Sequence, residues 1–203
     1  MILALQIAIV LFAYILGSIP MGYYLTKIYT GHNILDHGSG NIGSTNVSRV
    51  AGKKISIITQ LFDMAKGLIP VAIVMILRYY DILAPAPHYI YVVALATIIG
   101  HDFSIFLGFK GGRGVNTTLG ASLLLSPIPV LGSVLIYYLT KWITKYVSLA
   151  SILLGISLPI IAFFIDGLSE LVYYLIICAL LIIVRHSSNI IRLINGTEPT
   201  TRT

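Results

Sequence analysis

Long apolar runs separated by short polar segments dominate the chain, and their lengths are the first structural signal. Most of the runs are close to the roughly 20 residues that an α-helix needs to cross the hydrocarbon core of a bilayer. A transmembrane β-barrel would instead show short segments of alternating hydrophobicity, which the sequence lacks. The pattern therefore predicts membrane-spanning helices over residues 3–25, 55–77, 89–107, 115–140, 147–165 and 171–184.

The run over residues 115–140 does not fit one straight helix. It contains Ser126-Pro127-Ile128-Pro129 near its middle, and proline inside a helix removes a hydrogen-bond donor and clashes with the preceding turn. Basic residues also flank both of its ends, so a single span would put one of them on the wrong side of the membrane. We expect two short helices that turn at the prolines, and one proline-kinked span is the alternative.

The last run, 171–184, corresponds to only about 21 Å of helix, which is short for a span. We expect the helix to continue to Ile194. Arg185, Asn189 and Arg192 then share one stripe at positions i, i+4 and i+7. A polar face would begin where this helix leaves the membrane.

Composition and charge fix the class of protein and its orientation. Of the 203 residues, 57% are hydrophobic and only 10% charged, against roughly 25% charged in soluble domains. The positive-inside rule places the basic connections in the cytoplasm. We therefore predict an all-α integral membrane protein, a single domain over residues 1–203 with seven transmembrane segments, the N-terminus outside and the C-terminus cytoplasmic. Basic residues cluster at 26–54 (Lys27, Arg49, Lys53, Lys54), 108–114 (Lys110, Arg113), 141–146 (Lys141, Lys145) and in the tail (Arg185, Arg192, Arg202).

Three polar segments interrupt the apolar sequence on the predicted cytoplasmic face. We name them polar segment 1 (38–49, GSGNIGSTNVSR), polar segment 2 (100–118, GHDFSIFLGFKGGRGVNTT) and polar segment 3 (185–198, RHSSNIIRLINGTE). Together they are rich in cations and hydrogen-bond donors and poor in acids. This combination indicates a small anionic ligand.

Polar segment 2 has the clearest chemistry. Lys110 and Arg113 flank a glycine pair, and Asn116 and Thr117 open the next helix. Glycine lets backbone N–H groups approach an anion, and a helix N-terminus favours negative charge. The alternative is a flexible interfacial turn whose cations meet anionic lipid headgroups.

The other polar positions also allow two interpretations. Arg49 in polar segment 1 suits phosphate oxygens, but its neighbours are equally typical of helix caps. In polar segment 3, His186 is a candidate proton acceptor and Asn189 a donor, or the segment is simply a basic helix end. Asp63 and Lys66, at i and i+3 inside a span, are either functional or a structural ion pair.

Several classes of site and partner are excluded. Cys178 is the sole cysteine, so neither a disulfide nor a thiolate metal site is available. No cluster of histidine, cysteine or carboxylate indicates a metal, and we expect no cofactor. The net charge of +6 is confined to membrane-proximal segments, so we expect no nucleic-acid partner.

These motifs resemble the acyl-phosphate-dependent glycerol-3-phosphate acyltransferases of bacterial membranes (PlsY type). The resemblance covers nearly the whole chain, and Asp63-x-x-Lys66-Gly67 also fits the family's second helix. Arg113 stands where the family usually has lysine, and Ser104 where a proline is common. The matching stretches are Ser39-Gly40-Asn41 through Thr45-Asn46 and Arg49, Gly100-His101 through Phe109-Lys110-Gly111-Gly112, and Arg185-His186-x-x-Asn189-x-x-Arg192 ending at Gly196-x-Glu198.

The resemblance implies a multi-pass enzyme of the cell (inner or plasma) membrane with a cytoplasmic site. Such an enzyme transfers a fatty acyl group from acyl phosphate to the sn-1 hydroxyl of glycerol 3-phosphate. The products are 1-acyl-glycerol 3-phosphate (lysophosphatidic acid) and phosphate, in the first step of phospholipid synthesis. The partners are the two substrates, the lipid bilayer and, as a candidate, the soluble enzyme that makes acyl phosphate. A transporter for a small phosphate-bearing anion is the alternative.

The motifs and the resemblance together predict the site residues. The general base is left open among His186, His101 and the substrate's own phosphate. The predicted catalytic residues are Ser39, Arg49, His186 and Asn189; the substrate-binding residues are Asn41, Thr45, Asn46, His101, Lys110, Gly111, Gly112, Arg113, Gly114, Thr117 and Arg185; the structural residues are Asp63, Lys66 and Glu198.

Overall fold

The computed structural model describes residues 2–83 and 85–201, so the tail cation Arg202 lies outside the described residues. The described residues are helical and contain no strand. The chain divides into two compact units, unit 1 over residues 1–124 and unit 2 over residues 125–203. The predicted all-α class is confirmed for the described part of the chain.

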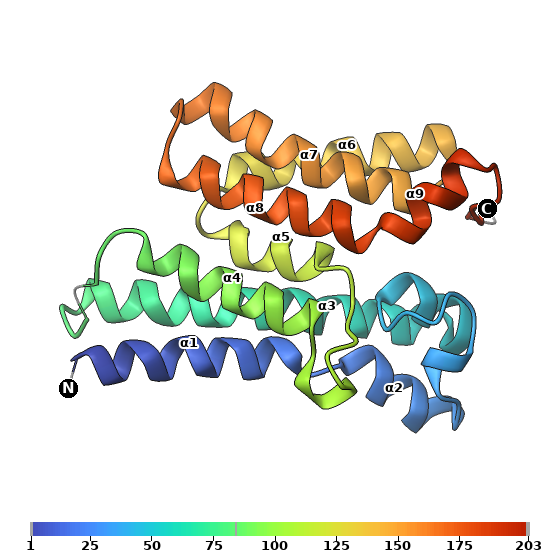
Figure 1. The fold of residues 1–203 in the computed structure, drawn as a ribbon, viewed down its shortest axis with the longest axis horizontal. Coiled ribbons are helices and arrows are strands. Elements are labelled where there is room, and N and C mark those ends of the chain that lie inside the picture. The colour runs from blue at the N-terminus through green and yellow to red at the C-terminus, as the bar shows by residue number, and fades with distance from the viewer. Residues whose placement is uncertain (1, 84, 202–203) are drawn as a thin grey trace. The chain divides into compact units, whose positions relative to one another are not determined.

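Unit 1 is built around helices that pack lengthwise (Figure 1). Its elements are α1 (Ile2–Ser18), α2 (Met21–Thr30), the 3-10 turn η1 (Ile34–Asp36), α3 (Ser44–Tyr79), α4 (Tyr89–Asp102), the 3-10 turn η2 (Ile105–Leu107) and α5 (Val115–Leu123). Helices α1 and α4 run in the same direction. The Tyr89 hydroxyl donates to the Gln6 carbonyl oxygen (2.7 Å) at one end, and the Ser104 hydroxyl donates to the Ser18 carbonyl oxygen (2.5 Å) at the other.

The chain changes direction twice within unit 1, once inside the predicted span 3–25 and once before the predicted span 55–77. The span 3–25 breaks at Pro20, between α1 and α2. Helix α3 changes direction at Gly52, whose φ of 85° is a left-handed conformation that favours glycine. The Ser56 hydroxyl donates to the Ser44 carbonyl oxygen at 2.7 Å, whereas a straight helix would separate these residues by about 18 Å. The first two turns of α3 therefore fold back on the rest of the helix.

Helices α3 and α5 approach each other through reciprocal glycines. A methyl group on Gly67 of α3 would overlap the Thr117 carbonyl oxygen of α5, and one on Gly120 of α5 would overlap the Met64 carbonyl oxygen of α3. Small residues at such contacts let helix backbones pack closely in a membrane. This packing fixes the start of α5, where polar segment 2 ends.

Unit 2 packs α7 against both α6 and α8. Its helices are α6 (Pro127–Thr144), α7 (Val147–Asp166), α8 (Glu170–Arg185) and α9 (Ser187–Ile194). The interruption predicted near Ser126 is present, because α5 ends at Leu123 and α6 begins at Pro127. Since α5 and α6 belong to different units, the choice between a hairpin and a kinked span stays a prediction.

The predicted continuous helix from 171 to Ile194 is wrong. Helix α8 ends at Arg185, and α9 leaves it at an angle of 60°. The bend lies at His186, whose ring Nδ1 donates to the Ile182 carbonyl oxygen (2.8 Å) within the last turn of α8. Arg185 therefore belongs to a different helix from Asn189 and does not share its stripe.

Helices long and apolar enough to cross a membrane occur in both units. Among the described residues they are Ile2–Thr30, Ser44–Tyr79, Tyr89–Leu107 and Val147–Asp166, with the bent pair Glu170–Ile194 as a fifth candidate. Large apolar side chains such as Leu11, Phe62 and Phe164 are exposed on these elements, as lipid-facing residues are. The chain is thus a multi-pass integral membrane protein.

We expect Gly120→Ala to destabilise the protein by about 1–3 kcal/mol, because the added methyl meets the Met64 backbone rather than a movable side chain. Thermal unfolding in detergent measures the effect. Gly132→Ala is the control, since its methyl would meet only the end of the Ile161 side chain (2.9 Å). Equal unfolding temperatures for the two variants would contradict close α3–α5 packing.

Candidate active site

Asn46 organises polar segment 1 from its centre. Its side chain is almost fully buried, with the residue 2% exposed. Its Nδ2 donates to the carbonyl oxygens of Ile34 (3.4 Å), His37 (3.0 Å) and Asn41 (2.9 Å). Its Oδ1 accepts the backbone N–H of Ser39 (2.9 Å). The Asn46 amide thus makes hydrogen bonds with four backbone groups of polar segment 1 and the turn before it. Asn46 was predicted to bind substrate, but its polar atoms are used to hold this part of the backbone.

Gly38 makes this arrangement sterically possible. A methyl group there would overlap Asn46 Oδ1, and the residue has a φ of +62°. The side chain of Asn41 completes the loop by accepting the Gly43 N–H (2.8 Å). The glycines and amides of the segment are therefore used first to fold the loop.

Ser39 and Arg49 are the groups that polar segment 1 presents outward. Both residues are exposed, and Thr45 between them is half-buried. Among the described residues, neither the Ser39 hydroxyl nor the Arg49 guanidinium has a hydrogen-bond or ion-pair partner. Arg49 lies on the first two turns of α3, whose position is set by the break at Gly52. A rigid short helix thus presents an unpaired guanidinium.

In polar segment 2, the glycine pair packs directly on His101. The Gly112 N–H donates to the His101 carbonyl oxygen (2.9 Å). A methyl on Gly111 would overlap that carbonyl oxygen, and one on Gly112 would overlap the His101 ring. Gly114 has a φ of +73° and lies against the Asp102 carboxylate. No side chain larger than glycine fits this close approach, so the loop backbone is held against the end of α4.

The cations of polar segment 2 differ in exposure. Lys110 is exposed and Arg113 is half-buried. The loop leads into the N-terminus of α5, where Thr117 is fully buried and its backbone packs on Gly67. The first amides of a helix are free to bind an anion, so this turn combines backbone donors with positive charge.

A hydrogen bond joins polar segments 1 and 2 within unit 1. The Asn116 side-chain Nδ2, at the start of α5, donates to the Ser44 hydroxyl (3.3 Å) at the start of α3. Two helix N-termini are thereby brought together. The first of these helices carries the exposed Arg49 in its first two turns, and the second follows the loop that presents Lys110.

A buried charged cluster lies deeper in unit 1. Lys66 Nζ forms an ion pair with Asp63 Oδ1 (2.9 Å) and donates to the Ile19 carbonyl oxygen (3.1 Å). The His101 Nδ1 lies 3.7 Å from the same Asp63 oxygen. Asp63 and Lys66 are 3% and 4% exposed. The structure thus pairs the two intramembrane charges with each other.

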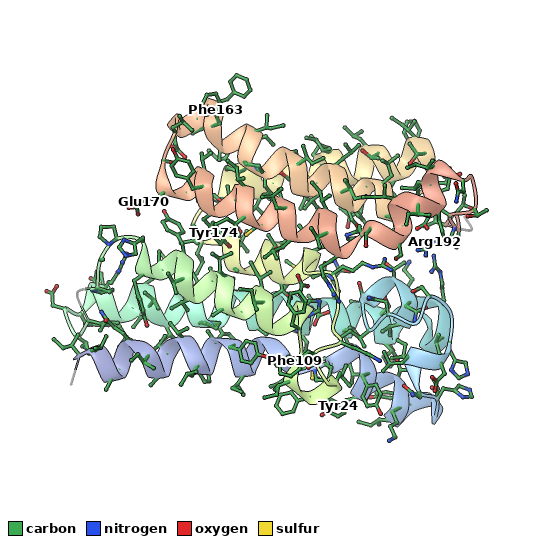
Figure 2. All side chains as sticks on the ribbon, viewed as in Figure 1. Tyr24, Phe109, Phe163, Glu170, Tyr174 and Arg192 are labelled. Carbon is green, nitrogen blue, oxygen red and sulfur yellow. The ribbon has the colours of Figure 1, made fainter. Side chains whose placement is uncertain are left out.

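Polar segment 3 lies in unit 2 and folds around Glu198. Asn189 Nδ2 donates to Glu198 Oε1 (2.7 Å), and Arg192 Nε donates to Oε2 of the same carboxylate (2.7 Å). The tail continues to Thr201, whose N–H donates to the Lys145 carbonyl oxygen (2.8 Å) at the end of α6. Figure 2 shows Arg192 on α9 and Glu170 at the opposite end of α8. The Glu198 carboxylate therefore fastens α9 to the tail.

The contacts of Glu198 change its proton affinity. Burial acts to raise its pKa, but hydrogen bonds from Asn189, Ser148 and Arg192 and the charge of Arg192 outweigh burial, so the pKa lies below its ordinary value. The carboxylate is thus ionised at neutral pH. It is available as the acceptor that holds Asn189.

His186 is buried at the bend between α8 and α9. A carbonyl oxygen only accepts, so the His186 Nδ1 that contacts the Ile182 carbonyl carries the proton. In the neutral ring Nε2 then bears the lone pair. Arg185, one residue earlier, is half-buried at the end of α8.

The structure brings the predicted residues together in two groups. The residues of polar segments 1 and 2 belong to unit 1, with Asp63 and Lys66, and those of polar segment 3 belong to unit 2. A joint site made of all three segments is a proposal. No group of three or more metal-ligating side chains occurs among the described residues.

A family model for glycerol-3-phosphate acyltransferase matches residues 7–196. The chain belongs to the glycerol-3-phosphate acyltransferase family. The resemblance predicted from the sequence is confirmed.

Similar proteins cover nearly the whole chain. The glycerol-3-phosphate acyltransferase of Clostridium acetobutylicum is 45% identical over 190 residues, 93% of this chain and 96% of that protein. The one from Macrococcus caseolyticus is 44% identical over 197 residues, 96% of this chain and 97% of that protein. The crystal structure of PlsY (YgiH), an integral membrane glycerol 3-phosphate acyltransferase, superposes with a TM-score of 0.89 in its glycerol 3-phosphate form. It is 37% identical and covers 98% of this chain and 96% of that one. The lysophosphatidic acid form gives a TM-score of 0.86 at 36% identity, with the same coverage.

Several residues that shape the candidate site were not among the predicted site residues. Asn116 and Ser44 join the starts of α5 and α3, Ser56 donates to the Ser44 carbonyl oxygen across the break at Gly52, and the buried Ser104 hydroxyl donates to the Ser18 carbonyl oxygen. Serine before a helical run is a capping signal in sequence, but its long-range partner is not visible there.

We expect Glu198→Gln to lower the free energy of unfolding at pH 7 by about 1.5–3 kcal/mol, since it removes a charge-assisted contact. Because the folded pKa is lowered, the stability from Glu198 is complete above its unfolded pKa of about 4.3 and is lost as the pH falls through the folded pKa. The gap between parent and variant should therefore close below about pH 4. Unfolding temperatures in detergent at several pH values measure it.

Asp166→Asn is the matched control for Glu198→Gln, because Asp166 is exposed and has no partner among the described residues. It should change stability little at any pH. A difference between parent and Glu198→Gln that stays unchanged from pH 7 down to about pH 2 would contradict the assigned role.

Proposed function

We propose that this chain transfers a fatty acyl group from acyl phosphate to the sn-1 hydroxyl of glycerol 3-phosphate. One observation in unit 1 carries the proposal. The Asn116–Ser44 hydrogen bond joins the start of α3, which carries the exposed Arg49, to the start of α5, which follows the glycine loop and the exposed Lys110. Both substrates carry phosphate, and this end of unit 1 supplies cations and backbone donors. Membership in the family identifies the acyl acceptor.

The reaction needs little covalent help from the protein. The sn-1 hydroxyl oxygen attacks the acyl carbonyl carbon, the bond from that carbon to the phosphate oxygen breaks, and phosphate leaves with its electron pair. Acyl phosphate is an activated anhydride, so positioning and charge stabilisation account for most of the catalysis. Arg49, Lys110 and Arg113 bind the two phosphates, and the Ser39 hydroxyl stabilises the oxyanion.

The hydroxyl proton has three candidate acceptors. The Nε2 lone pair of His186 is chemically suited, because Nδ1 is committed to the Ile182 carbonyl oxygen. The His101 ring packs against Gly112 and so supports the loop backbone. The substrate's own phosphate is the third candidate.

The domain organisation, membrane topology and orientation that we propose agree with this site. The chain acts as a single domain with seven spans in the cell membrane, N-terminus outside and C-terminus cytoplasmic. Three polar segments then face the cytoplasm, where a soluble enzyme delivering acyl phosphate can reach them. The basic connections support this orientation, since the acidic connections contain Asp81, Asp166 and Glu170.

Purified protein in lipid nanodiscs should convert labelled glycerol 3-phosphate to lysophosphatidic acid with palmitoyl phosphate but not with palmitoyl-CoA, without added metal. Arg49→Ala should lower kcat/KM by about 10- to 100-fold, the equivalent of a charge-assisted phosphate contact. Arg49→Lys should recover only part of the loss, because the bidentate fork is gone.

Lys53→Ala is the matched control, since it removes an exposed cation just beyond the break at Gly52. It should retain parental kcat/KM. If Arg49→Ala and Lys53→Ala lose activity equally, Arg49 contributes only general charge. Glycerol 3-phosphate binding without product from either donor would contradict the enzyme, and uptake into liposomes would then test the transporter.

The proposed topology can be tested with single cysteines in a Cys178→Ala background. Lys54→Cys and Asp166→Cys both lie at exposed positions. In intact spheroplasts, a membrane-impermeant maleimide should label Asp166→Cys and should label Lys54→Cys only after permeabilisation. Labelling of Lys54→Cys from outside would reverse the orientation.

A further inference from the structure

The buried pair Asp63–Lys66 has no step to perform in acyl transfer. Removing two charges from water is unfavourable, and replacing a buried pair by apolar groups of similar volume is often neutral for stability. Stability alone therefore does not account for this pair. Its contacts point to another role.

On one side, the pair fixes the break between α1 and α2. Lys66 Nζ donates to the Ile19 carbonyl oxygen (3.1 Å), directly before Pro20. Helix α3 is thereby tied to the point where α1 ends. This contact sets where the Lys66 ammonium, and hence the Asp63 carboxylate beside it, can lie.

On the other side, the pair meets His101 at the end of α4. Asp63 Oδ1 lies 3.7 Å from His101 Nδ1. The His101 carbonyl oxygen accepts the Gly112 N–H (2.9 Å), and the ring fills the space where a Gly112 side chain would be. A rotation of this ring would therefore push the loop backbone, because the contact leaves no room for a methyl group.

We propose that Asp63 and Lys66 are positioning residues: they hold the His101 ring and, through it, the backbone of Gly111–Gly114 in the conformation that binds a substrate phosphate. The proposal rests on the proposed function for the identity of the ligand. The path of contact runs from the α1–α2 break through α3 and α4 to the loop. Every step of it lies within unit 1.

The test compares Asp63→Asn/Lys66→Met with the parent. The double variant keeps the shape and removes both charges, so no lone charge is left buried. We expect KM for glycerol 3-phosphate to rise at least tenfold with kcat changed less than threefold, because the loop binds the phosphate before reaction. Hydrogen exchange of peptides covering 108–114 should become at least tenfold faster, since the loop backbone no longer packs against a fixed His101 ring.

A purely structural role would give a different result. Fewer folded molecules would lower the apparent kcat and leave KM and loop exchange unchanged, and this outcome would overturn the proposal. Asp63→Leu/Lys66→Met is the second variant if the first does not fold, because apolar groups of similar volume then replace both charges and no lone charge stays buried. It should show the same rise in KM and exchange.

Arg78→Met is the matched control, since Arg78 is also an α3 cation and donates to the Ala86 and Pro87 carbonyl oxygens at the opposite end of the helix. It should leave KM and the exchange of 108–114 unchanged. If the parent protein makes no lysophosphatidic acid, the proposed function fails, and the exchange measurement still decides the positioning role. Unchanged exchange in both Asp63 variants would refute it.

Discussion

Each interruption of a helix in this chain leaves backbone carbonyl groups that need a hydrogen-bond donor, and the fold depends on how these are satisfied. Hydrocarbon supplies no donors, so side chains must. Lys66 donates to the Ile19 carbonyl and Ser104 to the Ser18 carbonyl, both at the break after α1, and Ser56 links the two parts of α3 by donating to the Ser44 carbonyl across the break at Gly52. The same donors fix the directions of the helices on either side of each break. The breaks also lie beside the polar segments, so the requirement that stabilises the fold also shapes the site.

The membrane-length helices could be predicted because a long apolar run has few other structures available. Residues 147–165 fall within α7 and residues 55–77 within α3. The changes of direction at Gly52 and His186 could not be predicted in the same way. Polar spacing of i, i+4 and i+7 fits a straight helix as well as two helices joined at a bend. The bend lies at His186, whose backbone leaves helical geometry (φ −99°, ψ 10°), and the periodicity of the sequence does not mark that position.

The sequence predicted which residues form the candidate site better than it predicted the role of each residue. Asn46 and Ser39 both belong to polar segment 1, and both were predicted from the sequence as site residues. In the structure the Asn46 amide is used by the loop backbone, while the Ser39 hydroxyl is exposed. Gly111 and Gly112 were interpreted as donors to an anion, and they also pack on His101. A polar or small residue in such a loop can stabilise the loop itself or bind a ligand. Only its contacts in the structure show which of these it does.

The two histidines of the polar segments illustrate how backbone contacts assign chemistry. His101 lies between the Asp63 carboxylate and the Gly112 backbone, and its own carbonyl holds the loop. Its ring is therefore part of the support for the turn that we propose to bind phosphate. In His186 the Nδ1 N–H donates to the Ile182 carbonyl oxygen, which leaves Nε2 as the basic nitrogen of the neutral ring. The same carbonyl oxygen also accepts the His186 backbone N–H (3.0 Å), so the contact that fixes the tautomer belongs to the last turn of α8.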